Sequence, residues 1–145
     1  SYKDHGDFEN AIKWYKITLD QDNWNQEHYI CCLRMHDCYT HSNQIETGFF
    51  YLVKAFKYDP ERLECSMPLL IHYCCDGQYK IAYNYYLNVK DYFENKYLTA
   101  NIDDKLFINI DVYNFRVPYY MIIIADKIQD FDCVIRMFEI IFIKK

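Results

Sequence analysis

A repeating order of turn, anchor, small and large residues limits most strongly how this chain can fold. Three segments align without gaps, and they begin at Gly6, Asn43 and Gly77. In each segment an apolar anchor stands two places after the turn residue, a small residue three places later, and a large residue four places beyond that. Spacings of three and four put side chains on one face of a helix. The small and large positions are Ala11, Gly48 and Ala82, and Tyr15, Leu52 and Tyr86.

The spacing of the turn residues indicates the class of repeat. Gly6 and Asn43 lie 37 residues apart, and Asn43 and Gly77 lie 34 residues apart. The second interval is the period of tetratricopeptide repeats, which this chain therefore resembles. A looser fourth copy begins 52 residues after Gly77 and follows an insertion. Its aligned positions are Gln129, Phe131, Val134, Phe138 and Ile141.

This pattern predicts an all-α fold, an α-solenoid of stacked antiparallel helix pairs. The small residue lets two helices approach closely, and Gly or Asn at the turn can adopt the left-handed conformation that ends a helix. One helix pair cannot bury both of its faces, so neighbouring pairs must stack. The chain has only three glycines and three prolines among 145 residues, which disfavours an all-β fold.

The length fits a single repeat domain over 1–145. We expect Asp59 and Pro60 to start a helix, Pro118 to fall in a first turn, and Pro68 to kink its helix or to mark its true start. The expected helices cover about 8–20, 27–41, 44–58, 61–75, 78–94, 116–128 and 131–143. The repeats cover about 1–22, 27–58, 61–94 and 116–143, with an insertion over about 96–114.

The insertion is rich in apolar residues, and we expect it to be ordered. Side chains of this kind are rarely left in water, so they should cover the edge of the third repeat and prepare the entry of the fourth. The residues concerned are Tyr97, Leu98, Leu106, Phe107, Ile108, Ile110, Val112 and Tyr113.

Charge and apolar runs exclude two classes of partner. The net charge is −5 and the basic residues do not cluster, so we predict no nucleic-acid binding. The longest apolar run, 117–125, is about half the length that spans a bilayer, and no signal peptide is found. The chain opens at Ser1 without an initiator Met and closes inside the apolar stretch 138–143, which predicts a piece of a larger protein.

Seven cysteines, with pairs at Cys31-Cys32 and Cys74-Cys75 inside apolar runs, are typical of reduced, buried thiols in the cytoplasm. Several Cys and His residues lie close together in residues 31–41, as they would in a zinc site. Zinc needs four convergent ligands and no C-x-x-C motif occurs, so we expect core cysteines and surface histidines instead. The histidines of that segment are His36 and His41.

Acidic residues offer two further candidates for chemistry. Asp20-Gln21-Asp22 has the D-x-D pattern of metal-holding sites, but it stands at an expected helix end with no strand before it. Asp103, Asp104 and Asp111 fall in the insertion, where solvated charges are the commoner case. We therefore predict no catalytic, cofactor-binding or metal-binding residue, although a Cys/His dyad formed in space stays open.

Binding is the usual activity of such stacks. In tetratricopeptide proteins the first helix of each pair lines a concave groove. The aligned positions predict six groove-facing residues, with a solvated or packed surface as the alternative for each. They are Asp37, His41, Glu64, Met67, Arg116 and Tyr119.

Three short motifs carry a more specific resemblance. Trp24 and Glu27 come first, then the segment 58–64 with Pro60, Arg62 and Glu64, and then the segment 106–116. The last begins Leu-Phe and contains Val112-Tyr113 followed by Arg116. This order resembles the helical repeat region C-terminal to the catalytic domain in family 2 glycosyltransferases of bacteria and large DNA viruses. The chain is rich in Ile, Asn, Lys and Tyr, which have AT-rich codons, and this composition resembles that of the amoeba-virus members of the family.

The resemblance implies a sugar transferase as the parent protein, with donor and metal residues in an upstream domain. This chain would be the non-catalytic scaffold or interaction region of that protein, and it would bind a protein partner or its own catalytic domain. Its expected location is the cytoplasm, which is the cytoplasm of the host if the source is a virus. No catalytic residue is carried over. A free-standing adaptor that binds a protein in its groove is the alternative, and a small helical enzyme is a third possibility.

Overall fold

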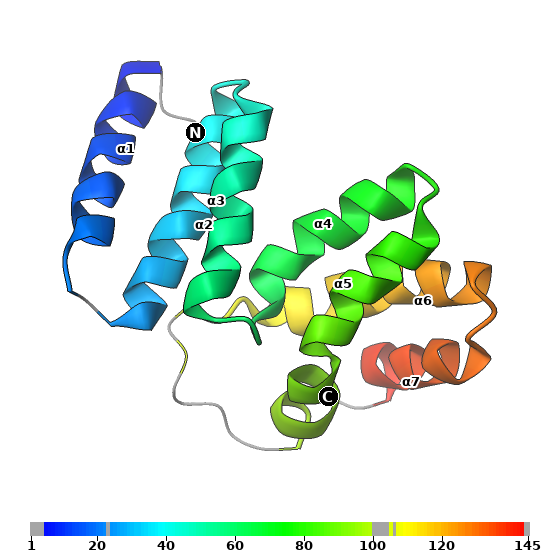
Figure 1. Ribbon diagram of the computed structural model, residues 1–145. Coiled ribbons are helices and arrows are strands. Elements are labelled where there is room, and N and C mark those ends of the chain that lie inside the picture. The colour runs from blue at the N-terminus through cyan, green and yellow to red at the C-terminus, as the bar shows by residue number, and fades with distance from the viewer. Residues whose placement is uncertain (1–4, 23, 100–104, 106, 144–145) are drawn as a thin grey trace. The chain divides into compact units, whose positions relative to one another are not determined.

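The structure is a computed structural model that describes residues 5–22, 24–99, 105 and 107–143 (Figure 1). All regular structure in these residues is helical, which confirms the predicted all-α class with packing between successive helices. The elements are α1 (His5–Asp20), α2 (Asn25–His41), α3 (Ile45–Tyr58), α4 (Leu63–Cys75), α5 (Tyr79–Asp91), the π-helical η1 (Tyr92–Tyr97) and η2 (Val112–Arg116), α6 (Val117–Lys127) and α7 (Phe131–Phe142).

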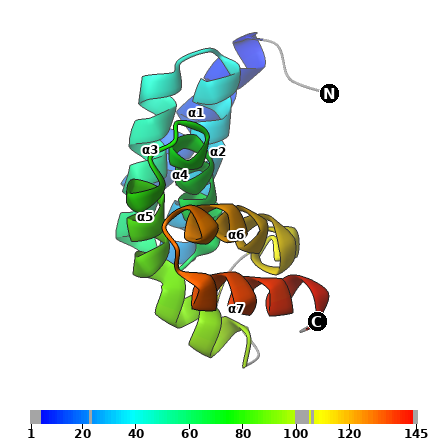
Figure 2. The same cartoon turned by 90° about the vertical axis from the view of Figure 1, so that its right-hand side faces the viewer.

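The chain divides into two compact units. Unit 1 combines Ser1–Pro60 with Asp104–Phe107, and it contains α1, α2 and α3. Unit 2 combines Glu61–Asp103 with Ile108–Lys145, and it contains the remaining elements. The backbone thus leaves unit 1 after α3, returns to it briefly, and leaves again. In unit 2, α6 and α7 lie side by side (Figure 2).

Three helix pairs share one connection. Asn43, Gly77 and Gln129 have φ angles of 60°, 74° and 65°, the left-handed conformation that ends a helix. At each turn the next residue donates its N–H to the carbonyl five places earlier, at N···O distances of 2.7, 2.9 and 2.9 Å. These positions are the turn residues of the second, third and fourth copies, so the alignment located all three turns. The pairs they join are α2–α3, α4–α5 and α6–α7.

The buried positions of α3 and α5 also follow the repeat. Gly48, Leu52 and Ala55 are buried in α3, and the buried residues of α5, at the same offsets, are Ala82, Tyr86 and Val89. Gly48 lies at a close approach of α3 to α2, because a Cβ built there would lie 3.0 Å from Thr40 Oγ1 and 3.2 Å from the His36 carbonyl oxygen. Ala11 is only half-buried, as α1 packs chiefly on α2.

We expect Gly48→Leu to lower the free energy of unfolding by roughly 1–3 kcal/mol, because the larger side chain must push α3 away from α2. The measurement is a urea titration followed by far-UV circular dichroism. Thr47→Leu is the matched control, since Thr47 is exposed on the same helix and should change stability little. If the two variants are equally stable, Gly48 does not lie at a close crossing of α2 and α3.

The fourth copy departs from the alignment inside its helix. The buried residues of α7 are Cys133, Met137, Ile140 and Ile141. The aligned position Phe138 is instead 50% exposed, and Val134 is half-buried. The buried face is therefore rotated by about one residue, roughly 100°. The cause is one-sided packing, because among the described elements α7 contacts chiefly α6 and η2.

The sixth helix begins earlier than predicted. Helical structure is continuous from Ile110 to Lys127, and the π-helical η2 lies within it, directly before α6. Pro118 therefore lies inside a helical run, although it is the second residue of α6 proper. A proline ring clashes with the carbonyl four residues earlier, and the wider π turn before it relieves that contact. Pro68 likewise lies inside α4, which starts at Leu63, so Pro68 does not mark a helix start.

The insertion is partly packed. Val112 and Tyr113 are buried, and Tyr97, Leu98 and Ile108 pack against the core of unit 2. The prediction fails for Phe107 and Ile110, which are 69% and 61% exposed. Phe107 has a φ of 52°, the left-handed conformation that non-glycine residues adopt mainly in turns. Leu106 lies outside the described residues.

Candidate functional site

Two of the predicted groove residues form an exposed aromatic patch on unit 2. Arg116 ends η2, and Tyr119 lies in the first turn of α6, where it is 46% exposed. Phe115 is 48% exposed and stacks on Tyr119, with ring centroids 5.8 Å apart and an interplanar angle of 24°. Phe115 and Tyr119 stand four residues apart, so the continuous helix puts them on one face. We call Phe115, Arg116 and Tyr119 the aromatic patch.

Phe115 was not among the predicted site residues. The signal that could have located it is its place four residues before Tyr119 in an uninterrupted helix. Phe115 lies at the junction between the expected insertion, which ends at about Asn114, and the expected helix, which begins at about Arg116, so its spacing predicted no helix face.

Glu64 does not present a free carboxylate. Its side chain is 8% exposed and pairs with the fully buried Arg62 at 2.9 Å. The Tyr113 hydroxyl donates to Glu64 at 2.7 Å, and the Asn109 N–H donates at 3.0 Å. Tyr113 in turn accepts the Leu63 N–H at 3.1 Å. Glu64 thus ties the insertion to the start of α4.

Burial and the nearby Glu64 carboxylate both raise the pKa of the Tyr113 hydroxyl. The phenol therefore stays protonated over the physiological pH range and remains a hydrogen-bond donor to Glu64. A permanently protonated, buried phenol suits a structural tie rather than proton transfer.

Of the other predicted groove residues, one is half-buried and two are exposed on α2. Met67 is half-buried and packs against the core of unit 2. His41 is exposed on α2, with Nδ1 2.7 Å from the Asp37 carbonyl oxygen, and its ring stacks on Phe8 of α1 at 5.9 Å. The Asp37 residue itself is exposed. His41 therefore supports the packing of α1 on α2.

A second buried network ties residue 105 to unit 1. Lys105 Nζ lies 2.7 Å from Asp59 Oδ2, and both side chains are 5% exposed. Gln26 donates to the same oxygen at 2.5 Å. Asp59 therefore joins the end of α3 both to α2 and to a segment 46 positions later in the sequence. Asp59 was predicted only as a helix-starting residue, and α4 instead starts at Leu63.

The cysteines offer little chemistry. All seven are free thiols, six of them buried and only Cys75 exposed. Burial raises the pKa values of Cys32 and Cys133 to about 11, so both thiols are protonated at neutral pH and are poor nucleophiles. Within the described ranges, no three or more His, Cys, Asp or Glu side chains converge as a metal site would require.

The acidic candidates are scattered. Asp20 ends α1, Asp22 is exposed beyond it, and the Gln21 carbonyl oxygen between them lies 2.9 Å from His28 Nε2. Asp111 is exposed at the N-terminal side of η2. Asp103 and Asp104 lie outside the described residues.

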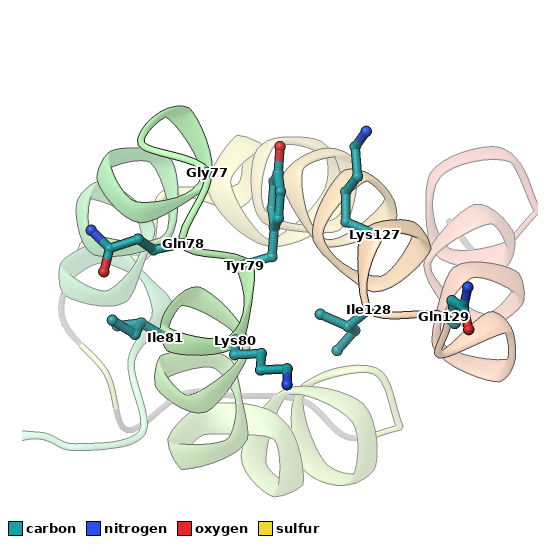
Figure 3. Close-up of a pocket in the computed structure, with 8 residues that line it drawn as sticks. All are labelled: Gly77, Gln78, Tyr79, Lys80, Ile81, Lys127, Ile128 and Gln129. Carbon is teal, nitrogen blue, oxygen red and sulfur yellow. The ribbon is translucent and has the colours of Figure 1, made fainter.

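A surface hollow of about 560 Å³ opens between two turns of unit 2. Tyr79 and Lys127 project to the same side of it, with the Lys127 ammonium 6.0 Å from the Tyr79 ring centroid (Figure 3). Its lining supplies ammonium, amide, phenol and aliphatic groups, and no carboxylate, thiol or imidazole is among them. The lining residues are Gly77, Gln78, Tyr79, Lys80, Ile81, Lys127, Ile128 and Gln129.

The fold and these surfaces define the chain as an all-α protein of the helical-repeat type. Comparison with protein families, characterised proteins and solved structures found no match. In the part of the chain that the structure describes, no helix combines the length and apolar character needed to cross a membrane.

Proposed function

We propose that this chain is a non-catalytic, tetratricopeptide-like scaffold region of a family 2 glycosyltransferase, in which an upstream domain carries out sugar transfer. The observation that carries the proposal is the contact between Glu64 and Tyr113. These residues belong to two of the three segments that resemble the glycosyltransferase region, and they are 49 positions apart in the sequence. Their role here is to fasten helices, which is what a scaffold requires of its characteristic residues.

The chemistry of sugar transfer supports a separate catalytic domain. Transfer from a nucleotide donor needs a metal or cationic group at the diphosphate and a carboxylate near the acceptor hydroxyl. Such groups are typically held at the carboxyl ends of strands in an α/β sheet. Among the described residues, Glu64 and Asp59 have buried structural partners, and the hollow beside Tyr79 has no carboxylate in its lining.

The aromatic patch is the surface we assign to the partner, either the catalytic domain of the same protein or another protein. Interfaces are enriched in Tyr, Phe and Arg, and a few such residues supply most of the binding energy. The patch combines all three types on one exposed helical face. The free thiols favour a reducing, cytoplasmic location for this contact.

The test begins with the sequence that precedes Ser1 in the parent gene. Alternating strands and helices with an Asp-rich motif after a strand would support the proposal, whereas further helical repeats would favour the adaptor. With such a domain in hand, transfer from nucleotide sugars is assayed for the full protein and for residues 1–145 alone. We expect activity only in the full protein.

The patch is tested by titrating labelled residues 1–145 with the purified catalytic domain. We expect Phe115→Ala combined with Tyr119→Ala to weaken binding at least tenfold. Phe50→Ala is the matched control, because Phe50 is a similarly exposed aromatic residue in unit 1. If the double variant binds the catalytic domain as tightly as the wild type does, the aromatic patch is not the binding surface. If residues 1–145 alone transfer sugar, this chain is not a non-catalytic scaffold.

A further inference from the structure

The hollow between two turns of unit 2 has a lysine on each side. One side is the junction of α4 with α5 and contributes Lys80, and the other is the junction of α6 with α7 and contributes Lys127. Both residues are exposed. Over the ranges that the structure describes, neither ammonium group lies within ion-pair distance of a carboxylate. The hollow therefore presents two positive charges to a ligand.

The carboxylates that flank these two junctions in the sequence are outside the lining. The Asp76 carboxylate accepts a hydrogen bond from the Gln78 amide, and the Asp130 carboxylate accepts one from the Tyr83 hydroxyl at 2.6 Å. Asp126 is exposed but does not line the hollow. The whole chain has a net charge of −5, so a lining whose only charges are positive is a local exception. Charge complementarity therefore favours an anionic ligand here.

Apolar and amide groups separate the two cations. In Figure 3 the Lys80 and Lys127 side chains point in opposite directions, and Ile128 lies between their ammonium groups in this view. Gln78 and Gln129 add side-chain amides, each of which can both donate and accept hydrogen bonds. A ligand that fills this hollow of about 560 Å³ therefore meets an apolar centre with a cation towards each end.

We propose that the hollow binds an acidic peptide segment of a partner protein, in which an apolar side chain stands between carboxylates. The apolar side chain packs on Ile128, and the carboxylates pair with Lys80 and Lys127. A peptide backbone carries both N–H and C=O groups, which the two glutamine amides match. A small anion such as phosphate would leave the apolar centre uncovered. The lining shares no residue with the aromatic patch, so this site does not depend on the proposed contact with a catalytic domain.

Fluorescence anisotropy measures the binding of residues 1–145 to a labelled peptide with a central leucine flanked on both sides by glutamates. We expect Lys80→Glu combined with Lys127→Glu to weaken binding at least tenfold, because both ion pairs become repulsive. Lys13→Glu combined with Lys57→Glu is the matched control. These two lysines are exposed in unit 1, so the control changes the net charge equally and should leave the Kd nearly unchanged. Far-UV circular dichroism checks that each variant is folded.

Altered peptides test the chemistry of the ligand. Serine in place of the central leucine should weaken binding several-fold, and glutamines in place of the glutamates should abolish it. No binding at about 1 mM peptide would overturn the proposal, as would equal weakening by the two double variants. If the serine peptide binds as tightly as the leucine peptide, and inorganic phosphate displaces it better than chloride of equal ionic strength, the hollow is a site for small anions and the peptide assignment is wrong.

Discussion

Glu64→Ala is expected to lower the free energy of unfolding of unit 2 by about 3–5 kcal/mol, because it breaks a buried ion pair by removing one partner. The Arg62 side chain is fully buried and would lose its carboxylate partner. The Tyr113 hydroxyl and the Asn109 N–H would lose the same acceptor. Urea unfolding followed by far-UV circular dichroism measures the loss, and hydrogen exchange assigns it to the amides of α4.

The matched control is Glu61→Ala. Glu61 pairs with Lys96 at 3.4 Å, but the side chains are 41% and 59% exposed. Exposed pairs contribute about 1 kcal/mol or less, so this substitution should barely move the transition. If the two alanine variants unfold at the same urea concentration, Glu64 is not the tie between the insertion and α4.

Lys105→Ala should destabilise unit 1 by about 3 kcal/mol, since it leaves the buried Asp59 carboxylate without its cation. Gln26 still donates to Asp59, which places the loss at the lower end of the usual range for a broken buried pair. Hydrogen exchange read by mass spectrometry is the sharpest measurement. Faster exchange is expected at the end of α3 and the start of α2, and not in α5.

Lys57→Ala controls for the removal of a lysine from unit 1. Lys57 lies in the last turn of α3 and is exposed, with its ammonium 5.8 Å from the Tyr58 ring centroid. It should change stability by less than about 1 kcal/mol. Slow exchange in both variants would mean that the Asp59–Lys105 pair does not stabilise unit 1.

Local signals explain why the helix positions could be predicted. The helices expected over 27–41, 44–58 and 61–75 occur at Asn25–His41, Ile45–Tyr58 and Leu63–Cys75. The first and third of these helices are followed by the left-handed turn residues Asn43 and Gly77, and the faces follow spacings of three and four. Both signals lie within a few adjacent residues of the sequence.

The remaining differences depend on distant contacts. The rotation of α7 follows from packing chiefly on one side, which a fixed alignment cannot express. The π-helical turn before Pro118 belongs to a helix that starts at Ile110. That start lies inside the apolar insertion and could not be predicted from the sequence. The candidate site divides in the same way. Arg116 and Tyr119 are exposed as their helical positions suggested, whereas the Tyr113 hydroxyl that donates to Glu64 comes from 49 residues away.

The ion pair between Lys105 and Asp59 in unit 1 has a consequence for synthesis on the ribosome. Asp59 is made 46 residues before Lys105, and α4 and α5 are made between them. Translation proceeds at about 5–20 residues per second, so several seconds pass between the synthesis of Asp59 and that of Lys105, which pairs with it. Completion of unit 1 is therefore delayed until Lys105 has been translated, after α4 and α5, so the two units cannot mature strictly in the order of the sequence.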